Sequence, residues 1–299
     1  MSPIIDTVER NNRDPEIKKA EAAMFKLFWP EVRGNYFFRN RRVYMDFLKS
    51  GDGKIYYMPQ QSLTIPAFVL VGNWRDRTDI TALWYVKGVG LAKKSLVMEA
   101  AGECFNSGAE KMVTKLLGEY EAAEFRQWGF KKACRIVLFE KRLADRPGIA
   151  GQPVGIRLSR FRKSMLEKVL KVDSSSFDDF WRLDDRTLEA IASSCRRNVF
   201  LVAQRGNQVV GYAVAGANGS LGYLQRLGVE RGSHGQGIGR LLCSAVLRTL
   251  YDMGTTVVMV NTQEDNQVGL RLYDKLGFRE LLDTRYIMQY EANDYRRVS

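Results

Sequence analysis

Residues that bind metal ions are scarce in this sequence, which holds one histidine and four cysteines among 299 residues. The cysteines lie far apart and form no Cys-x-x-Cys pair, so the number and spacing of zinc ligands are both missing. We therefore expect no metal site. Unpaired cysteines are typical of reducing compartments, and the four thiols are predicted to be free and buried in a cytoplasmic protein.

Long apolar segments are missing as well. No run of about 18 apolar residues occurs, which is the length that spans a bilayer. The first residues, MSPIIDTVERNNRDPEIKK, lack the basic-then-apolar order of a secretory signal. The sequence predicts no membrane partner.

The positive charge is not concentrated in one region. The formal net charge is +12; residues 1–150 carry 25 Lys and Arg against 18 Asp and Glu, and residues 151–299 carry 21 against 16. A nucleic-acid surface gathers its basic residues, so a nucleic-acid partner is disfavoured but stays open. The overall charge favours a phosphate-rich small molecule and, mildly, an acidic acceptor.

The chain is too long for one ordinary core, and we predict two domains. The segment Ala144–Pro153 contains two prolines and two glycines, which discourage both helix and strand. The predicted domains are residues 1–146 and 147–299.

The second half begins with short strand-like runs and continues with alternating strands and helices. Alternating or β-branched runs predict strands, and apolar residues at helical spacing predict helices. The predicted strands are 154–158, 199–204, 208–216, 221–229, 255–260 and 284–290, and the helices are 162–172, 185–194, 238–253 and 267–276. This order predicts an α/β (α+β) fold with a sheet of mixed direction.

The first half repeats this order in weaker form. Its predicted strands are 67–74, 80–86, 111–114 and 135–140, and its predicted helices are 93–105 and 119–127. Gly108 corresponds to Gly254, and the Gly-Phe of Trp128-Gly-Phe130 corresponds to that of Leu276-Gly-Phe278. We interpret the two halves as an internal duplication.

Three alternating glycines stand between a predicted strand and a predicted helix, in His234-Gly-Gln-Gly-Ile-Gly239. Glycine adopts positive φ, and the free N–H groups of a first helical turn bind anions, so this loop suits a phosphate. The spacing fits neither the dinucleotide motif nor the nucleoside-triphosphate motif. The first half has only Gly88-Val-Gly90 here, without a third glycine in step.

This loop resembles the acetyl-CoA motif Arg/Gln-x-x-Gly-x-Gly/Ala of the Gcn5-related N-acetyltransferase (GNAT) superfamily, with histidine in the Arg/Gln place. The stretch Asn266–Phe278, written NQVGLRLYDKLGF, is similar to the family's Asn-x-x-Ala-x-x-Leu-Tyr-x-x-x-Gly-Phe. The resemblance implies two tandem GNAT-like domains, each with a mixed, mostly antiparallel twisted sheet flanked by helices. Residues 1–146 would be a degenerate copy without cofactor, and residues 147–299 the catalytic domain.

The resemblance also implies a site for acetyl-CoA as cosubstrate, without a metal. In the family the fourth and fifth strands splay apart around the pantetheine arm. Main-chain groups of the fourth strand would bind the arm, loop amides would hold the diphosphate, and the motif asparagine would hydrogen-bond the arm. The implied cofactor-binding residues are Leu227, Gly228, Val229, His234, Gly235, Gln236, Gly237, Ile238, Gly239, Arg240, Asn266 and Tyr273.

Tyr273 is implied as the catalytic acid. A phenol of pKa about 10 can protonate a departing thiolate whose conjugate acid has a pKa near 8.5. The backbone N–H of Val229 would hold the oxyanion. His234 is expected to cap the loop or touch the cofactor rather than transfer a proton.

The general base and the acceptor stay open. Ribosomal-protein acetyltransferases of the family carry a glutamate where this chain has Asn261, which puts a ribosomal-protein substrate in doubt. Glu264, Asp265, Glu230 and Tyr223 (through a water) are the candidate bases. The acceptor is expected to be the amine of a small molecule or peptide, and the sequence does not reveal the oligomeric state.

Three alternatives to general amine acetylation stay open as well. The first is acetylation of a small thiol–sugar amine, as in mycothiol synthases, which also contain two copies. The second is an aminoacyl-tRNA-dependent transferase, which the positive charge suits but which would not need the diphosphate loop. The third is a catalytically inactive acyl-CoA sensor.

Overall fold

A single twelve-stranded sheet runs through the whole molecule. The computed structural model describes residues 16–34, 38, 40–59 and 66–297. The strand order is β1-β2-β3-β4-β5-β12-β6-β11-β10-β9-β8-β7. The strands are β1 Lys18–Lys19, β2 Gly53–Met58, β3 Ala67–Trp74, β4 Arg77–Lys87, β5 Lys111–Thr114, β6 Lys131–Arg142, β7 Ile156–Arg160, β8 Arg197–Arg205, β9 Gln208–Asn218, β10 Leu221–Val229, β11 Val257–Gln263 and β12 Arg279–Glu291.

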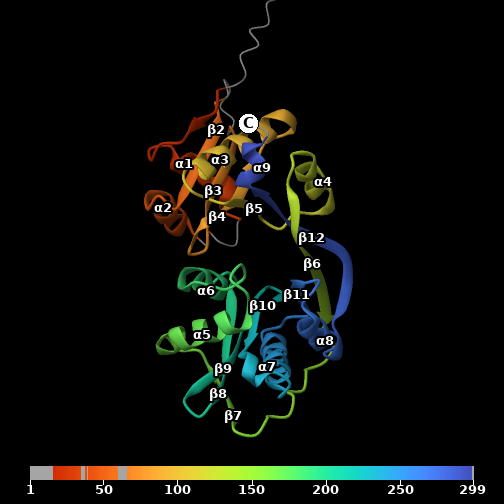
Figure 1. Ribbon diagram of the computed structural model, residues 1–299. Coiled ribbons are helices and arrows are strands. Elements are labelled where there is room, and N and C mark those ends of the chain that lie inside the picture. The colour runs from red at the N-terminus through yellow and green to blue at the C-terminus, as the bar shows by residue number, and fades with distance from the viewer. Residues whose placement is uncertain (1–15, 35–37, 39, 60–65, 298–299) are drawn as a thin grey trace, which may run out of the picture.

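Helices cover the sheet in both halves (Figure 1). They are α1 Phe25–Val32, α2 Arg41–Lys49, α3 Gly90–Asn106, α4 Glu119–Gln127, α5 Leu166–Ser176, α6 Asp185–Ala192, α7 Ile238–Asp252, α8 Gln267–Lys275 and α9 Ala292–Arg296. In the second half α7 packs over one apolar face of strands β8–β10, and α5 and α6 pack over the other. In the first half, too, helices cover both faces of the sheet, with α3 on one face and α1 and α2 on the other.

The two halves exchange their last strands. β6 belongs to the first half by sequence but pairs with β11 of the second, and β12 at the end of the second half pairs with β5 of the first. β6 and β12 also pair with each other, so these two long strands lie side by side between the two lobes (Figure 1). The predicted fold class is confirmed, and the exchange joins the two predicted sheets into one.

Most predicted elements are present. Four match the predicted bounds: β3, β5, β10 and α4. The predicted absence of helix and strand in Ala144–Pro153 is confirmed, since neither occurs between Arg142 and Ile156. The helix predicted to start at Arg162 instead begins as a 3-10 turn and becomes α5 at Leu166.

All four cysteines are free thiols, as predicted. Cys104 and Cys243 are buried, but Cys134 and Cys195 are only half-buried, so the expectation of burial holds for two of them. Within the described ranges no helix is long and apolar enough to cross a membrane.

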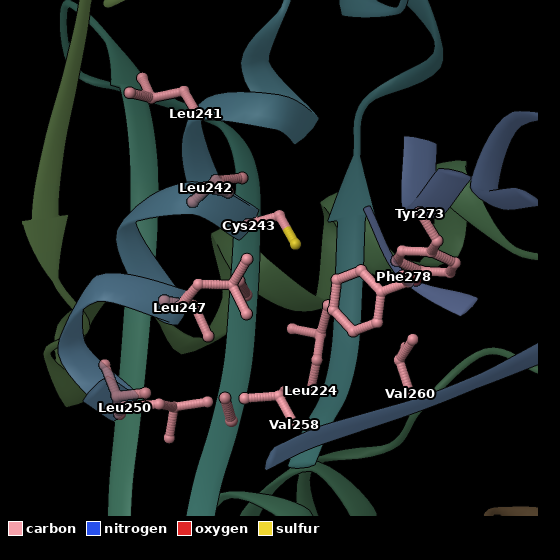
Figure 2. Packing of buried hydrophobic residues seen from close by; sticks show 14 of the residues in the cluster. Leu224, Leu241, Leu242, Cys243, Leu247, Leu250, Val258, Val260, Tyr273 and Phe278 are labelled. Carbon is pink, nitrogen blue, oxygen red and sulfur yellow. The ribbon is translucent and has the colours of Figure 1, made fainter. Parts of the chain in front are cut away.

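The core beside the glycine loop is apolar and closely packed. Leu242, Cys243, Leu247 and Leu250 of α7 belong to one cluster with Leu224 of β10, Val258 and Val260 of β11 and the pair Tyr273 and Phe278, and Figure 2 shows the sulfur of Cys243 on the side of these two rings. This packing fixes the first turn of α7 and the position of α8 relative to the sheet.

Candidate functional site

Strands β10 and β11 separate halfway along their length. They pair in parallel only from Leu221 with Val257 to Leu224 with Val260, although β10 continues to Val229 and β11 to Gln263. A β-bulge at Gln225 marks the point of separation. Because bulges bend a strand and increase its twist, this residue directs β10 away from β11.

The open edge of β10 presents main-chain groups toward the gap. The Glu230 N–H donates to the carbonyl of Val210 on β9 at 2.9 Å. In an antiparallel pair these groups alternate in direction, so Gly228 also faces β9, whereas Leu227 and Val229 face the gap. The edge can therefore bind an extended chain by strand-like hydrogen bonds.

The glycine loop ends in an open cradle of amides. Gly235 and Gly237 have φ of +75° and +78°, and a Cβ at residue 235 would meet no atom within 4 Å. Gly237 is the N-cap of α7, whose first intrahelical bond runs from Leu241 to Gly237. The N–H groups of the first helical turn therefore have no partner within the helix and can bind an anion.

The side chains of the loop support it rather than fill it. His234 Nε2 donates to the Val229 carbonyl at 2.8 Å, because a carbonyl can only accept. Gln236 is bonded to Arg205 and to the Gly232 carbonyl. Arg240 is exposed on the first turn of α7, where its positive charge is available to a phosphate.

The remaining glycine allows α7 and α8 to approach closely. A Cβ at Gly239 would lie 3.5 Å from Leu272 of α8. The buried side chain of Ile238 points into the core at the same turn. These two residues therefore position the cradle.

Asn266 caps α8. Its Oδ1 accepts the Gly269 N–H at 3.0 Å, and its Nδ2 donates to the Thr262 hydroxyl at 2.8 Å. A Cβ at Gly269 would lie 2.6 Å from Nδ2, so the glycine makes room for this cap. The predicted hydrogen bond from Asn266 to the cofactor stays a prediction, because the side chain already serves the helix.

Tyr273 lies on the buried side of α8, beside Phe278 and Phe139. Burial raises the pKa of its hydroxyl well above the usual range, and the nearby Cys243 thiol adds to the rise. The phenol is therefore protonated at any physiological pH. A group that must donate a proton meets its first requirement in this way.

The first half repeats the strand separation, since β4 and β5 pair only from Ile80 to Leu83 and a bulge lies at Trp84, but it lacks the glycine loop and the tyrosine. Two residues, Gly88 and Val89, connect β4 to α3, whereas eight residues, 230–237, connect β10 to α7. Helices α4 and α8 have nine residues each, and their seventh residues are Phe125 and Tyr273. The first half thus has neither the loop nor the hydroxyl.

A lysine closes the gap between α3 and α4. The Lys93 ammonium pairs with Glu124 and lies 5.6 Å from the ring centroid of Phe125 and 5.7 Å from that of Trp128. The corresponding gap between α7 and α8 carries Gly239 and Leu272 instead.

A pocket of about 500 Å³ lies where the two halves meet. Residues of β11 and of the turn before α8 form one side of it, the end of α5 and the segment after it form another, and strands β5, β6 and β12 contribute the rest. The lining residues are Lys111, Ala133, Cys134, Ser176, Phe177, Asp178, Phe180, Trp181, Gln263, Asp265, Asn266 and Gln289. Ser176 also donates to the Val229 carbonyl at 2.8 Å, which connects the pocket to the open edge of β10.

A buried ion pair fixes the segment after α5 to β10. Arg226 binds Asp173 at 2.7 Å and the Trp181 carbonyl at 2.8 Å, and its guanidinium lies 3.4 Å from the centroid of Phe177. Asp173 also accepts the hydroxyl of Tyr212. Sequence reasoning missed this network, although an aspartate directly after the buried valines of a helix stripe could have indicated it.

The first half holds the same segment from the other side. Trp74 donates to the Phe180 carbonyl at 2.8 Å and stacks on its ring at 5.1 Å. Arg75, whose φ is +61°, donates to the same carbonyl at 3.1 Å. The pocket wall thus depends on contacts from both halves.

The four candidate bases differ in their surroundings. Glu264 pairs with Lys132 and Arg135, and Glu230 accepts from Gln208. Tyr223 lies on the paired part of β10, before the gap. Asp265 lines the pocket and forms no ion pair with a described residue. No cluster of His, Cys, Asp and Glu that could hold a metal ion occurs in the described part of the chain.

Comparison with known proteins relates the second half to one family and the whole fold to known structures. Residues 166–278 match the model of the acetyltransferase (GNAT) family. The fold is similar to that of a tandem GNAT protein from the clavulanic acid biosynthesis pathway, with a TM-score of 0.65 and 13% identity over 93% of this chain and 99% of that one. The family match thus covers part of the second half, and the fold of the whole chain is similar to that of a tandem GNAT protein.

Curated relatives match about half of the chain. A mycothiol acetyltransferase from Thermobispora bispora is 30% identical over 148 residues, which cover 45% of this chain and 50% of the relative. Another, from Catenulispora acidiphila, is 26% identical over 172 residues, which cover 53% and 55%. This chain therefore spans about half the length of the curated relatives it matches.

Proposed function

We propose that this chain is an N-acetyltransferase that transfers the acetyl group of acetyl-CoA to a primary amine in a ternary complex. The observation that carries the proposal is the open edge of β10, which leads directly into the amide cradle of Gly235, Gly237 and Gly239. A diphosphate fits the cradle and an extended arm fits the edge. Acetyl-CoA supplies the activated acyl group when bound.

Each residue then has one task. Leu227 binds the arm through its main chain, and the N–H of Val229 holds the acetyl oxygen as charge develops on it. The Val229 carbonyl already accepts from His234 and Ser176. Tyr273 donates its proton to the departing sulfur. Loop amides and Arg240 hold the phosphates, and His234 keeps the loop against β10.

Asp265 is our choice for the general base. It lines the pocket next to Asn266, whereas Glu264 is held in ion pairs and Glu230 lies at the opposite side of β10. An Asp265→Asn variant should lose activity at neutral pH and regain part of it at higher pH, where the free amine deprotonates in solution. An unchanged pH–rate profile would exclude this residue.

The domains divide these tasks. Residues 147–299 bind the coenzyme and carry the chemistry, and residues 1–146 form a non-catalytic copy that holds the acceptor pocket through Trp74 and Arg75. Phe125 and Lys93 support the absence of a coenzyme site in the first domain.

A mycothiol-type acceptor is the second candidate, since the relatives that match are mycothiol acetyltransferases. An aminoacyl-tRNA-dependent transferase would leave the diphosphate cradle without a purpose. Retained tRNA, together with no affinity for the coenzyme, would favour that class.

Calorimetric titration with acetyl-CoA tests the proposal, followed by thiol release over a set of amines and peptides. We expect one binding site per chain and amine-dependent release of coenzyme A. A protein that ignores acetyl-CoA would refute the assignment.

A further inference from the structure

The pocket between the two halves has a charge opposite to that of the whole chain. Its charged lining residues are Lys111, Asp178 and Asp265, in a protein of net charge +12. The hydrogen bond from Arg77 chiefly lowers the pKa of the Asp79 carboxyl, and Lys111 lies close enough to add a smaller lowering. Asp178 and Asp265 form no ion pair with any described residue, so they leave the pocket negative.

Cys134 lies close enough to these carboxylates for their charges to affect the pKa of its thiol. The pKa of its thiol is raised to about 11, chiefly by burial, with smaller contributions from the charges of Asp265, Glu264 and Asp178 and against a hydrogen bond to the Ile287 backbone that lowers it. Both lining aspartates therefore lie near one point of the pocket. Glu264 adds little net charge there, because Lys132 and Arg135 neutralise it.

Three aromatic rings form the apolar part of the pocket, and the protein occupies one side of each. Arg226 lies against Phe177, Trp74 stacks on Phe180, and Arg75 lies 5.9 Å from the ring centroid of Trp181. The rings are thereby held in place, and hydrocarbon can pack on the parts that line the pocket. The volume of about 500 Å³ suits a small molecule.

We infer that the acceptor is a small aliphatic amine with a second positive charge and no acidic group. This rests on the proposed function, because one amine must reach Asp265 beside the gap between β10 and β11. Asp265 removes the proton of the reacting ammonium, and Asp178 holds the second ammonium group. The acidic acceptor that the overall charge favours is thus disfavoured by the pocket.

Three probes with the same five-carbon skeleton test the inference. They are 1,5-diaminopentane (charge +2), pentylamine (+1) and 5-aminopentanoate (zwitterion), each titrated into the full chain with and without saturating coenzyme A. We expect 1,5-diaminopentane to bind at least tenfold more tightly than pentylamine, and 5-aminopentanoate to bind most weakly. Tighter or equal binding of 5-aminopentanoate, or no binding of any probe, would overturn the inference.

Asp178→Asn is the decisive variant. Asn keeps an oxygen for the Trp181 N–H, which Asp178 now accepts at 3.1 Å, so the segment keeps its cap. The preference for 1,5-diaminopentane over pentylamine should fall at least fivefold, and acetyl-CoA affinity should stay unchanged. The matched control is Asp179→Asn, since Asp179 is exposed, pairs with Arg182 and does not line the pocket.

Protection of Cys134 from alkylation tests whether 1,5-diaminopentane binds in this pocket, which Cys134 lines. Saturating 1,5-diaminopentane should slow the reaction of Cys134 with iodoacetamide at least fivefold and leave Cys195 unaffected, as followed by peptide mass spectrometry. Binding without protection would put the probe elsewhere and refute the inference. Because acetyl-CoA binding is measured separately, loss of the proposed function and loss of this acceptor class are distinct results.

Discussion

Residues 125 and 273 hold the same place in two copies of one helix, yet only the second has a hydroxyl. Removing it by Tyr273→Phe should lower kcat by about 10²- to 10⁴-fold, the usual contribution of a positioned acid. Acetyl-CoA affinity and thermal stability should stay close to wild type, because the change removes a single oxygen. Steady-state kinetics and calorimetry measure both effects.

Phe125→Tyr is the matched control for that variant. It places a hydroxyl at the equivalent position of the first half, where Lys93 and Glu124 close the gap, and it should leave kcat unchanged. If Tyr273→Phe retains full activity, Tyr273 is not the catalytic acid. If the wild-type chain binds acetyl-CoA but shows no activity, the sensor alternative is favoured over an enzyme.

Because its thiols are buried, the free energy of unfolding of the protein is expected to change with pH in the alkaline range. Cys243 is fully buried, and burial raises its pKa from 9.0 to about 12. Between pH 9 and pH 12 the unfolded chain loses this proton while the folded chain keeps it, so stability falls as the pH rises. The expected loss for this thiol is about 1.4 kcal/mol between pH 8 and pH 10.

Urea unfolding under reducing conditions at pH 8, 9 and 10 measures that loss. Cys243→Ala removes the titrating group, so its free energy of unfolding should be lower overall but fall less steeply with pH. Equal slopes in the two proteins would show that Cys243 does not contribute.

Asn266 and Tyr273 show which structural features a sequence motif can predict and which it cannot. The spacing of Asn266 and Tyr273 predicted that both face the same side of one helix; Tyr273 lies on α8, and Asn266 is the N-cap of that helix. The side-chain bonds of Asn266 could not be predicted, because they depend on Thr262 at the end of β11 and on the space beside Gly269. A capping asparagine and a ligand-binding asparagine have the same sequence pattern.

At the scale of elements, the contribution of the turn before α7 to acetyl-CoA binding can be separated from its contribution to stability. Gly237→Ala forces a side chain into left-handed backbone, at a cost of about 1–2 kcal/mol. Because this residue is the N-cap within the cradle, acetyl-CoA affinity should also fall at least tenfold by calorimetry.

Gly254→Ala supplies the same backbone strain outside the cradle. Its φ is +80° against +78° for Gly237, and it follows the other end of α7, where a Cβ would meet no atom within 4 Å. The two variants should lose similar stability, and only Gly237→Ala should lose affinity. Equal affinities would mean that the loop does not hold the coenzyme.

Element boundaries were predictable where local chemistry decides them. β10 and α4 match their predicted bounds because turn residues or glycines adjoin both of their ends. The start of α5 was misplaced because the 3-10 turn at Lys163–Met165 carries the same apolar pattern as a helix. The pocket wall after α5 has no periodic signal, since its position depends on Arg226 and Trp74, which are remote in sequence.

At the scale of the molecule, strand exchange was beyond prediction from the sequence. Strands 135–140 and 284–290 were each expected to complete their own half, because sequence-adjacent elements usually pack together. The two copies are similar enough that either last strand fits either sheet, and the connection lengths allow the exchange. The division at residue 146 stays a prediction about the two copies, but the hydrogen bonds of the sheet do not follow it.

The exchange predicts that the two halves stay together when the chain is cut. A protease site inserted after Ile149 lies in the exposed linker, and cleavage there separates the chain between β6 and β7. Each fragment then still contributes a long strand to the other, since β6 pairs with β11 and β12 pairs with β5. The cut protein should elute from a sizing column as a single species of about 34 kDa.

The same cut distinguishes exchange from simple contact between two finished domains. Two domains that each completed their own sheet would separate after cleavage or unfold in two independent transitions. Exchanged strands leave neither sheet complete alone, so the cut protein should unfold in one cooperative transition, at lower denaturant concentration than the intact chain because the linker no longer joins the fragments. Dissociation into two folded fragments on the column would contradict the exchange, and with it the pocket wall that both halves share.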